Sequence, residues 1–445
     1  MRITVIGAGY VGLVTGVGLA ATGHDVTFVE RSRHRLSELR EGRMPIEEPG
    51  LGEAYAANRG RIDVVERLAD AEDADLVFVC VATPIGEGGE SDLSQISSAL
   101  EDLRAYPALD VSVRSTLMPG FSARLPALLG RADGERISTN PEFLRQGSAM
   151  GDFAAPSRIV IGRFDETSDR HLALIDEVYR HLEAPRIAVS VAAAELIKNA
   201  ANAFLALKLS FVNEVAALSE GYGVEVDEVL AGIALDPRIG SAYMKPGLGF
   251  GGSCLPKELQ VVDVAGRRRG LAMHIARAAA QVNLEQQDRF AHRVLAELPA
   301  TQSRVGLLGL SFKANTDDLR GSPAIHVARR LVQAGHVVVA FDPVVRAEDA
   351  RLAVPGIETA ESAEAAFTDA HAVVIATEWP QFATLDLAKL APRMRQAVIF
   401  DGRGVLDPRL VVAAGISYRG VGRRSIDAPS ANAGSTSSAA RDLAG

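Results

Sequence analysis

Cysteine is scarce in this chain of 445 residues, and basic residues are outnumbered by acidic ones. Only Cys80 and Cys254 are present, too few for a disulfide framework, so a reducing cytoplasm is the expected compartment. Lysine and arginine total 47 against 56 aspartates and glutamates, which gives a formal charge of −9. This acidic balance argues against a nucleic-acid partner and against an anionic membrane surface. Any anionic ligand must therefore be held by a local cluster of donors.

Long apolar runs are also few. The mostly apolar run 3–21 superficially resembles a signal peptide, but five glycines interrupt it and no obvious cleavage site follows. No other stretch approaches the roughly twenty apolar residues of a membrane span, so no membrane partner is expected. Hydrophobic residues make up 47% and charged residues 23%, which excludes a largely disordered chain. At about 150 residues per domain, the length predicts about three domains.

Short apolar strands alternate with helical stretches in two parts of the chain. This pattern predicts an α/β fold with two Rossmann-like, doubly wound parallel sheets joined by a central helical segment. The expected strands are 3–6, 25–30 and 75–81 in the first part, and strand segments within 304–310, 334–343 and 369–377 in the second. We expect one Rossmann-like domain over 1–191, a helical domain with a dimer interface over 192–300, a second Rossmann-like domain over 301–424, and a disordered tail over 425–445.

A G-x-G-x-x-G motif, Gly7-Ala8-Gly9-Tyr10-Val11-Gly12, follows the first expected strand. Gly7 suits a tight turn, and Gly9 allows the pyrophosphate to approach the backbone closely. Gly12 allows the helix to pack closely on the strand. Glu30 ends the next strand, where an acidic side chain binds ribose hydroxyls and favours NAD over NADP. Arg31, Arg33 and Arg35 keep NADP open, because each could pair with a 2′-phosphate. A glycine-rich turn without a ligand is the alternative reading.

The stretch Phe250-Gly251-Gly252-Ser253-Cys254-Leu255-Pro256-Lys257 points to a reactive thiol. Pro256 suits the first turn of a helix that begins after Cys254. The positive end of that helix and Lys257 would both favour the thiolate. The alternative is a small buried cysteine in a loop. Cys80, within an apolar strand, is expected in the core.

Other polar residues lie where they could serve a site. Lys198 and Asn202 are four residues apart on one helix face and could stabilise an oxyanion, although such a lysine is often a solvated edge residue. Glu142, in the stretch NPEFLR, is either a site carboxylate or a surface-loop residue. Lys313 follows the first strand of the second half and could meet a diphosphate, with Arg320 as a second charge. Arg403 follows a strand at the sheet edge where ligands bind, yet an isolated arginine there is more often structural.

Together these motifs resemble those of the UDP-glucose/GDP-mannose dehydrogenase family over residues 1–407. The matching stretches, in order, are GAGYVG, TPIGEGGESD, STLMPG, NPEFLRQGSAMGDF, ELIKNAANAFLALKLSFVNE, GFGGSCLPKE, GLSFKANTDDLRGSP and FDGRG. The resemblance implies a cytoplasmic homodimer that uses NAD and no metal, binding NAD in the first Rossmann-like domain and a UDP-sugar in the second. It implies four-electron oxidation of UDP-glucose to UDP-glucuronate through a thiohemiacetal and a thioester on Cys254. GDP-mannose or another nucleotide sugar is the alternative substrate.

The resemblance also implies roles for individual residues. In catalysis, Cys254 is the nucleophile, Lys198 and Asn202 stabilise oxyanions, Glu142 and Thr116 take part in proton transfer, and Glu258 orients water. The implied NAD contacts are Gly7, Gly9, Val11, Gly12, Glu30, Arg35, Thr83, Thr116, Gln146, Lys257 and Arg320. The implied substrate contacts are Glu142, Phe143, Leu144, Arg145, Lys198, Asn202, Tyr243, Lys245, Gly247, Gly251, Lys313 and Arg403, with Arg238 reaching the partner subunit's substrate.

Two residues depart from the family pattern. Glu258 stands where the family usually has Asp, which lengthens the arm that orients water. Gln146 stands where it usually has Glu, which could alter cofactor affinity. Two other functions are also open: a non-catalytic nucleotide-sugar-binding regulator, and a two-electron dehydrogenase in which Cys254 is idle. The combination of Cys254, Lys198, Asn202 and Glu142 argues against the regulator.

Overall fold

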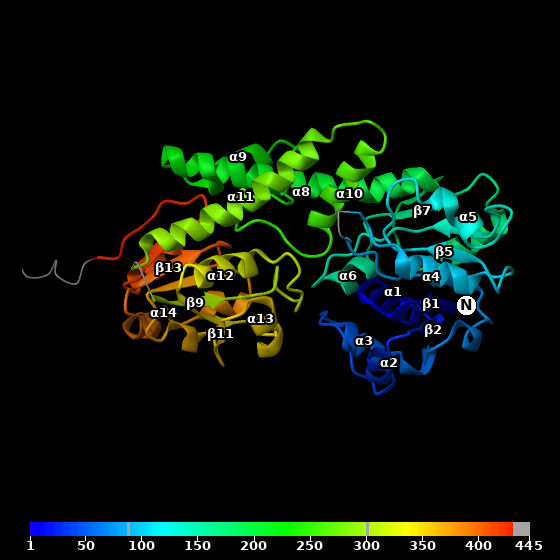
Figure 1. The fold of residues 1–445 in the computed structure, drawn as a ribbon, viewed down its shortest axis with the longest axis horizontal. Coiled ribbons are helices and arrows are strands. Elements are labelled where there is room, and N and C mark those ends of the chain that lie inside the picture. The colour runs from blue at the N-terminus through cyan, green and yellow to red at the C-terminus, as the bar shows by residue number, and fades with distance from the viewer. Residues whose placement is uncertain (87–89, 300–301, 430–445) are drawn as a thin grey trace, which may run out of the picture. The chain divides into compact units, whose positions relative to one another are not determined.

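The computed structural model describes residues 1–86, 90–299 and 302–429 (Figure 1). The chain forms two compact units. The first comprises Met1–Leu207, Gly252–Gln281 and Asn315–Asp317, and the second comprises Lys208–Gly251, Val282–Ala314 and the residues from Asp318 onward. The central helices are thus divided between the two units. The domain boundaries proposed from sequence stay a prediction, and the boundary at 300/301 falls outside the described residues.

The first unit is built on an eight-stranded sheet with the order β3-β2-β1-β4-β5-β6-β7-β8. Its strands are β1 (Arg2–Ile6), β2 (Asp25–Val29), β3 (Ile62–Val65), β4 (Leu76–Val79), β5 (Val111–Val113), β6 (Ile137–Thr139), β7 (Ile159–Arg163) and β8 (Arg186–Ser190). The helices among them are α1 (Tyr10–Ala21), α2 (Arg33–Arg40), α3 (Leu51–Ala57), α4 (Ser94–Leu103), α5 (Leu125–Leu128), α6 (Ala149–Ala154) and α7 (Asp169–Val178). Every residue of β4 is buried, as its continuous apolarity predicts, and Cys80 lies in the core beyond it.

One strand pair in this sheet departs from the predicted parallel arrangement. β6 and β7 are antiparallel, whereas the other neighbours are parallel. The connection 140–158 therefore starts and ends at the carboxyl edge of β6 instead of crossing back over the sheet. This places the stretch NPEFLRQG at the same edge as the glycine motif after β1.

The second unit contains a six-stranded, wholly parallel sheet with the order β11-β10-β9-β12-β13-β14. Its strands are β9 (Arg304–Leu308), β10 (Val337–Phe341), β11 (Glu358–Thr359), β12 (Ala372–Ile375), β13 (Val398–Asp401) and β14 (Ser417–Gly420). Its helices are α12 (Pro323–Gln333), α13 (Ala347–Ala353), α14 (Leu387–Leu390) and α15 (Pro408–Ala413). The order β3-β2-β1-β4-β5-β6 in the first sheet corresponds to the order β11-β10-β9-β12-β13-β14 in the second. The α/β class with two Rossmann-like sheets is therefore confirmed. In each, the order reverses beside the first strand, where ligands bind in such sheets.

The central helices are α8 (Val191–Tyr222), α9 (Val226–Ala234), α10 (Leu255–Arg267) and α11 (His274–Glu297), which confirms the predicted helical segment. By length and composition alone, α8 could cross a membrane, a feature that the sequence reading overlooked because polar residues are spread along it. A helix of a soluble protein meets the same criterion, so this is weak evidence for a membrane span. Several large apolar side chains of α8 are exposed, among them Phe204, Phe211 and Leu218.

The proposed disordered tail lies mostly beyond the described chain. Residues 430–445 fall outside the described residues. Within 425–429, Ile426 forms an antiparallel bridge with Tyr418.

Candidate active site

The glycine motif forms the turn from β1 into α1. Gly7 has a φ of +96°, which suits glycine. A Cβ on Gly12 would lie 1.9 Å from the carbonyl oxygen of Gly7, so no side chain fits there. Among the residues that the structure describes, a Cβ on Gly9 would have no neighbour within 4 Å, which leaves open space against the backbone. This geometry fits a dinucleotide pyrophosphate at the start of α1.

Glu30 lies beside this turn at the end of β2. Its buried carboxylate accepts hydrogen bonds from the backbone N–H groups of Ala8 at 3.0 Å and Ser32 at 2.7 Å. The three nearby arginines already lie beside carboxylates: Arg31 beside Asp102, Arg33 3.7 Å from Glu66, and Arg35 3.8 Å from Glu30. A 2′-phosphate would have to compete for them, so the site suits NAD better than NADP.

Cys254 is the residue at which α10 begins, and Pro256 lies in the first turn, as the sequence predicts. The side chain of Cys254 is exposed, which disagrees with the reading as a buried loop cysteine, although the protein groups around the sulfur still desolvate the thiol. Its sulfur lies 3.8 Å from the hydroxyl of Ser253. The thiol is therefore accessible at the N-terminus of a helix.

Lys198 and Glu142 form a buried ion pair near this cysteine. The Lys198 ammonium donates to the Glu142 carboxylate at 2.9 Å and to its carbonyl oxygen at 2.6 Å. Lys198 is 3% exposed and Glu142 6%, so neither the solvated-edge nor the surface-loop reading holds. Burial alone would raise the pKa of Glu142, but Lys198, the N–H of Leu144 and Arg114 together hold that pKa below its usual value. Burial alone would lower the pKa of Lys198, but Glu142 and Cys254 raise it.

The electrostatics of Cys254 correct one expectation from sequence. The sequence predicts that the helix end and Lys257 favour the thiolate. Instead, desolvation raises the pKa of Cys254 above its usual value, and Glu142 and Glu258 raise it further. Lys198 is the main cation that lowers this pKa. Lys257 also interacts with the thiolate, because Cys254 raises the pKa of Lys257. The resting nucleophile is a thiol.

Lys257 takes part in a different set of contacts. Its ammonium donates to the Thr83 hydroxyl at 2.8 Å, and that hydroxyl donates to the carbonyl oxygen of Thr116 at 2.8 Å. The segments after β4 and β5 are thus tied to the first turn of α10. Burial lowers the pKa of Lys257. Three implied NAD contacts therefore lie together at the carboxyl edge of the first sheet.

Glu258 is buried beside the same group of residues. Desolvation raises the pKa of its carboxyl above the usual value. Its Oε2 atom is buried and has no hydrogen-bond partner among the residues that the structure describes. Such a group tends toward its neutral, protonated form.

The remaining implied contacts of the first unit lie around the stretch 142–146. The carboxylate of Glu142 accepts the N–H of Leu144 at 2.6 Å, and Arg145 pairs with Asp152 at 2.6 Å. The ring of Phe143 lies beneath the guanidinium of Arg158, whose central carbon is 3.6 Å from the ring centroid. Asn202 is half-buried one turn along α8 from Lys198.

Arg403 is the best-defined implied contact of the second unit. It follows β13 and donates to the carbonyl oxygens of Ala376 at 3.0 Å, Gly249 at 3.1 Å and Phe312 at 3.1 Å. It therefore ties together the segments after β9 and β12 and the loop before Gly251. This agrees with a structural role and leaves ligand contact as a prediction.

Other implied contacts of the second unit are loop residues. The N–H of Gly247 donates to the side chain of Asn213 at 2.9 Å, and a Cβ on Gly251 would lie 2.2 Å from the Gly321 carbonyl oxygen. The ammonium of Lys313 lies 5.5 Å from the centroid of the Phe312 ring, and Arg320 pairs with Asp318. Tyr243 has a φ of +59°, and Lys245 is exposed. Arg238 is exposed and pairs with Asp236.

Two buried charged residues that support the candidate site were not predicted from the sequence. Arg114 is a buried guanidinium that donates to Thr15 and Tyr179, each at 2.9 Å, and to the side chain of Asn140. Its charge helps to lower the pKa of Glu142. The signal was a basic residue directly after the buried strand 111–113.

Glu195 is the second of these residues. In the first turns of α8, it accepts the N–H of Gly120, the N–H of Ser122 and the Ser122 hydroxyl, each at 2.6 Å. It thereby holds the loop that follows Thr116. A lone acid early in an apolar helix was the available signal.

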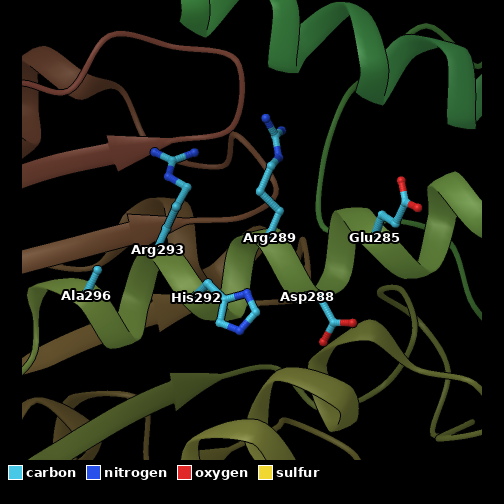
Figure 2. A pocket seen from close by; sticks show the side chains of 6 residues that line it. All are labelled: Glu285, Asp288, Arg289, His292, Arg293 and Ala296. Atoms are coloured by element: carbon cyan, nitrogen blue, oxygen red, sulfur yellow. The ribbon is translucent and has the colours of Figure 1, made fainter.

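A separate pocket of about 490 Å³ lies along α11 in the second unit (Figure 2). Figure 2 shows Arg289 and Arg293 on one side of the helix and Asp288 and His292 on the other. Both arginines pair with Glu220, and Asp288 pairs with His326 at 3.0 Å. These charges are satisfied within the chain, and the pocket contains none of the implied site residues.

The comparisons with known proteins cover almost the whole chain. Residues 1–183 match the NAD binding domain of the UDP-glucose/GDP-mannose dehydrogenase family, 192–285 its central domain and 306–408 its UDP binding domain. The UDP-glucose 6-dehydrogenase of Rhizobium meliloti (strain 1021) is 38% identical over 437 residues, which cover 95% of this chain and 100% of that protein. UDP-glucose 6-dehydrogenase YwqF of Bacillus subtilis (strain 168) is 37% identical over 96% of this chain and 98% of its own length.

Solved structures agree with this assignment. A UDP-glucose dehydrogenase from the hyperthermophilic archaeon Pyrobaculum islandicum superposes with a TM-score of 0.85 at 38% identity, covering 95% of this chain and 98% of that one. The UDP-D-ManNAc dehydrogenase of Pyrococcus horikoshii gives a TM-score of 0.83 at 27% identity, covering 95% and 99%. The matched NAD binding domain identifies the cofactor as NAD. The chain belongs to the UDP-glucose/GDP-mannose dehydrogenase family.

Proposed function

We propose that the chain catalyses the NAD-dependent, four-electron oxidation of UDP-glucose to UDP-glucuronate. The names of its relatives and the matched UDP binding domain support this substrate. The observation that carries the proposal is the buried Lys198–Glu142 pair beside the accessible thiol of Cys254. It combines an oxyanion donor, a proton acceptor and a nucleophile, which two successive oxidations at one carbon require.

The first unit holds the cofactor through the turn at Gly7–Gly12, Glu30, Thr83 and Lys257. When bound, NAD accepts a hydride from the sugar carbon in each oxidation. Glu142, ionised at neutral pH because of its lowered pKa, accepts a proton from the primary hydroxyl directly or through a water. The Lys198 ammonium stabilises the negative charge that develops on the same oxygen, and Asn202 can donate a second hydrogen bond.

Cys254 captures the aldehyde that the first oxidation leaves. The sulfur bonds to the carbonyl carbon and the thiol proton ends on the carbonyl oxygen, which forms a thiohemiacetal. The second oxidation removes a hydride from that carbon and the proton from its hydroxyl, which leaves a thioester. Water then adds to the thioester carbon, the C–S bond breaks, and the carboxylate and thiol are released. Glu258, with its raised pKa and unpartnered Oε2, is placed to orient that water.

We also propose that two copies pair through the central helices. Phe204, Phe211 and Leu218 recur at intervals of seven along α8, so they lie on one face, and they are 63%, 53% and 61% exposed. Large apolar side chains in such a row are typical of a face that another protein covers. Exposed Arg238 is then available to reach the partner subunit's substrate.

A reducing cytoplasm suits this chemistry. Both cysteines are free, and the exposed Cys254 must stay a thiol to act.

Steady-state turnover with a panel of nucleotide sugars tests the substrate assignment. UDP-glucose should give a kcat/KM well above those of GDP-mannose and UDP-N-acetylmannosamine. A clear preference for either of the other sugars would replace UDP-glucose while leaving the chemistry in place.

A further inference from the structure

Glu48 is a buried carboxylate that lies outside the motifs described above and takes no part in the proposed chemistry. It lies in the loop between α2 and α3 and is 5% exposed. Its Oε2 accepts the hydroxyl of Tyr10 and the N–H of Gly147, the latter at 2.6 Å. Its Oε1 accepts the N–H of Ala149 at 2.7 Å. One side chain thus contacts two segments that lie far apart in the sequence.

Both segments belong to the candidate site. Tyr10 is the fourth residue of the glycine motif and the first of α1, where the pyrophosphate is expected. Gly147 and Ala149 directly follow the stretch 142–146, which carries Glu142. The near end of that stretch is held at Asn140 by Arg114, and Glu48 holds its far end.

Tyr10 lies close to the reactive groups. Burial raises the pKa of Tyr10, the hydrogen bond to Glu48 and its charge raise it further, and Glu142 and Cys254 add to the effect. Its hydroxyl therefore stays protonated and acts as a donor to Glu48. A displacement of this pair would move the glycine turn relative to the Glu142 stretch.

We infer that Glu48 is a positioning residue that fixes the cofactor-binding turn and the Glu142 stretch against each other. The carboxylate is suited to this because both of its oxygens accept from N–H groups. An isosteric glutamine cannot replace it in either orientation, since its NH₂ group would face the N–H of Gly147 or that of Ala149. For its consequence in turnover the inference rests on the proposed function, but its effect on structure and on cofactor affinity does not.

The test compares Glu48→Gln with Glu47→Gln in the full-length protein. Glu47 is the adjacent glutamate and is exposed, so its variant makes the same chemical change without touching the contacts. The first readout is amide hydrogen exchange of the peptide that contains Gly147 and Ala149. The second is the dissociation constant for NAD, measured by calorimetry without sugar and well below the melting temperature. We expect Glu48→Gln to speed exchange at these amides and to weaken NAD binding about tenfold, the scale of one lost hydrogen bond to a charged group.

Glu47→Gln should match the wild type in both readouts. A Glu48→Gln protein with unchanged exchange and an NAD affinity within about twofold of wild type would overturn the inference. If Glu48→Gln does not fold, Tyr10→Phe tests the inference instead. It removes the hydroxyl contact with Glu48 and keeps the hydrogen bonds from the N–H groups of Gly147 and Ala149. A loss of NAD affinity of about fivefold supports the inference, and a change below about twofold contradicts it. A wild type that binds NAD but leaves UDP-glucose unoxidised would refute the proposed function alone.

Discussion

The ammonium of Lys198 and the carboxylate of Glu142 lie 2.9 Å apart, and both side chains are almost fully withdrawn from water. Desolvating two charges is costly, and the pair is retained only because each ion compensates the other. Both charges of the pair also act on the thiol of Cys254: Lys198 lowers the pKa of that thiol and Glu142 raises it. Stability and chemistry are therefore coupled at one contact.

Replacing Lys198 with Met should destabilise the fold and nearly abolish turnover. Glu142 would be left buried and unpaired, which costs about 3–5 kcal/mol of the free energy of unfolding. Loss of an oxyanion donor should lower kcat by about 10² to 10³. Urea unfolding and steady-state kinetics measure the two effects. Lys389→Met, which removes an exposed lysine paired with Asp386, should leave both near wild type. If the Lys198→Met protein had wild-type stability, Lys198 would not be offsetting the cost of burying the Glu142 carboxylate.

This stability loss should depend on pH in a defined direction. The folded-state pKa of Glu142 is lowered, so its contribution is present above its usual value of 4.5 and is lost as the pH falls through the folded-state pKa. The folded-state pKa of Lys198 is raised, so its contribution is present below 10.5 and is lost as the pH rises through the folded-state pKa. The difference between wild type and Lys198→Met should therefore shrink at acid pH. A constant difference from pH 3 to 7 would argue against the ion pair.

Alkylation by iodoacetamide should report the raised pKa of Cys254. Cys80 is buried with its pKa raised to about 12, so it will not compete. The alkylation rate should keep rising with pH through the usual thiol value of 9.0, because only the thiolate reacts. In Lys198→Met the curve should move further to alkaline pH, as one stabilising charge is gone. A plateau near pH 7 would contradict this electrostatic account.

Alanine at Gly9 and at Gly12 should fail in different ways. At Gly12 the new methyl would lie 1.9 Å from the Gly7 carbonyl oxygen, so the melting temperature should fall sharply. At Gly9 the methyl meets no atom of the described chain within 4 Å, so the fold should persist while NAD binding is lost. Thermal melting and calorimetric titration separate the two. Unimpaired NAD binding by Gly9→Ala would show that the pyrophosphate does not bind at this turn.

Introducing charge on the exposed face of α8 should separate the proposed dimer. Phe211→Glu places a carboxylate in the middle of the row formed with Phe204 and Leu218. Leu352→Glu is a matched control, since Leu352 is 83% exposed and lies on α13, which is not one of the central helices. Sedimentation equilibrium should show a dimer for wild type and the control and a monomer for Phe211→Glu. A dimer in all three would place the interface elsewhere.

Sequence reasoning succeeded where the cause is local. The strand-turn-helix at 2–21 and the helix that begins after Cys254 follow from apolar runs, glycines and a proline within a few residues. It could not supply contacts between distant segments. Lys198 and Glu142 are 56 residues apart, and Glu48 and Ala149 are 101 apart. The direction of the Cys254 pKa shift also depends on surroundings built from several segments, and so a reading based on its neighbours in sequence gave the wrong sign.

The most direct test of the central claim is the number of NADH molecules formed per UDP-glucose consumed, with wild type and Cys254→Ser compared. We predict two NADH per UDP-glucose for the wild type. For Cys254→Ser we predict that the four-electron reaction no longer runs at the wild-type rate. One NADH per sugar would identify a two-electron dehydrogenase with an idle cysteine, and none would indicate a binding protein. Two NADH at full rate from Cys254→Ser would contradict the covalent mechanism.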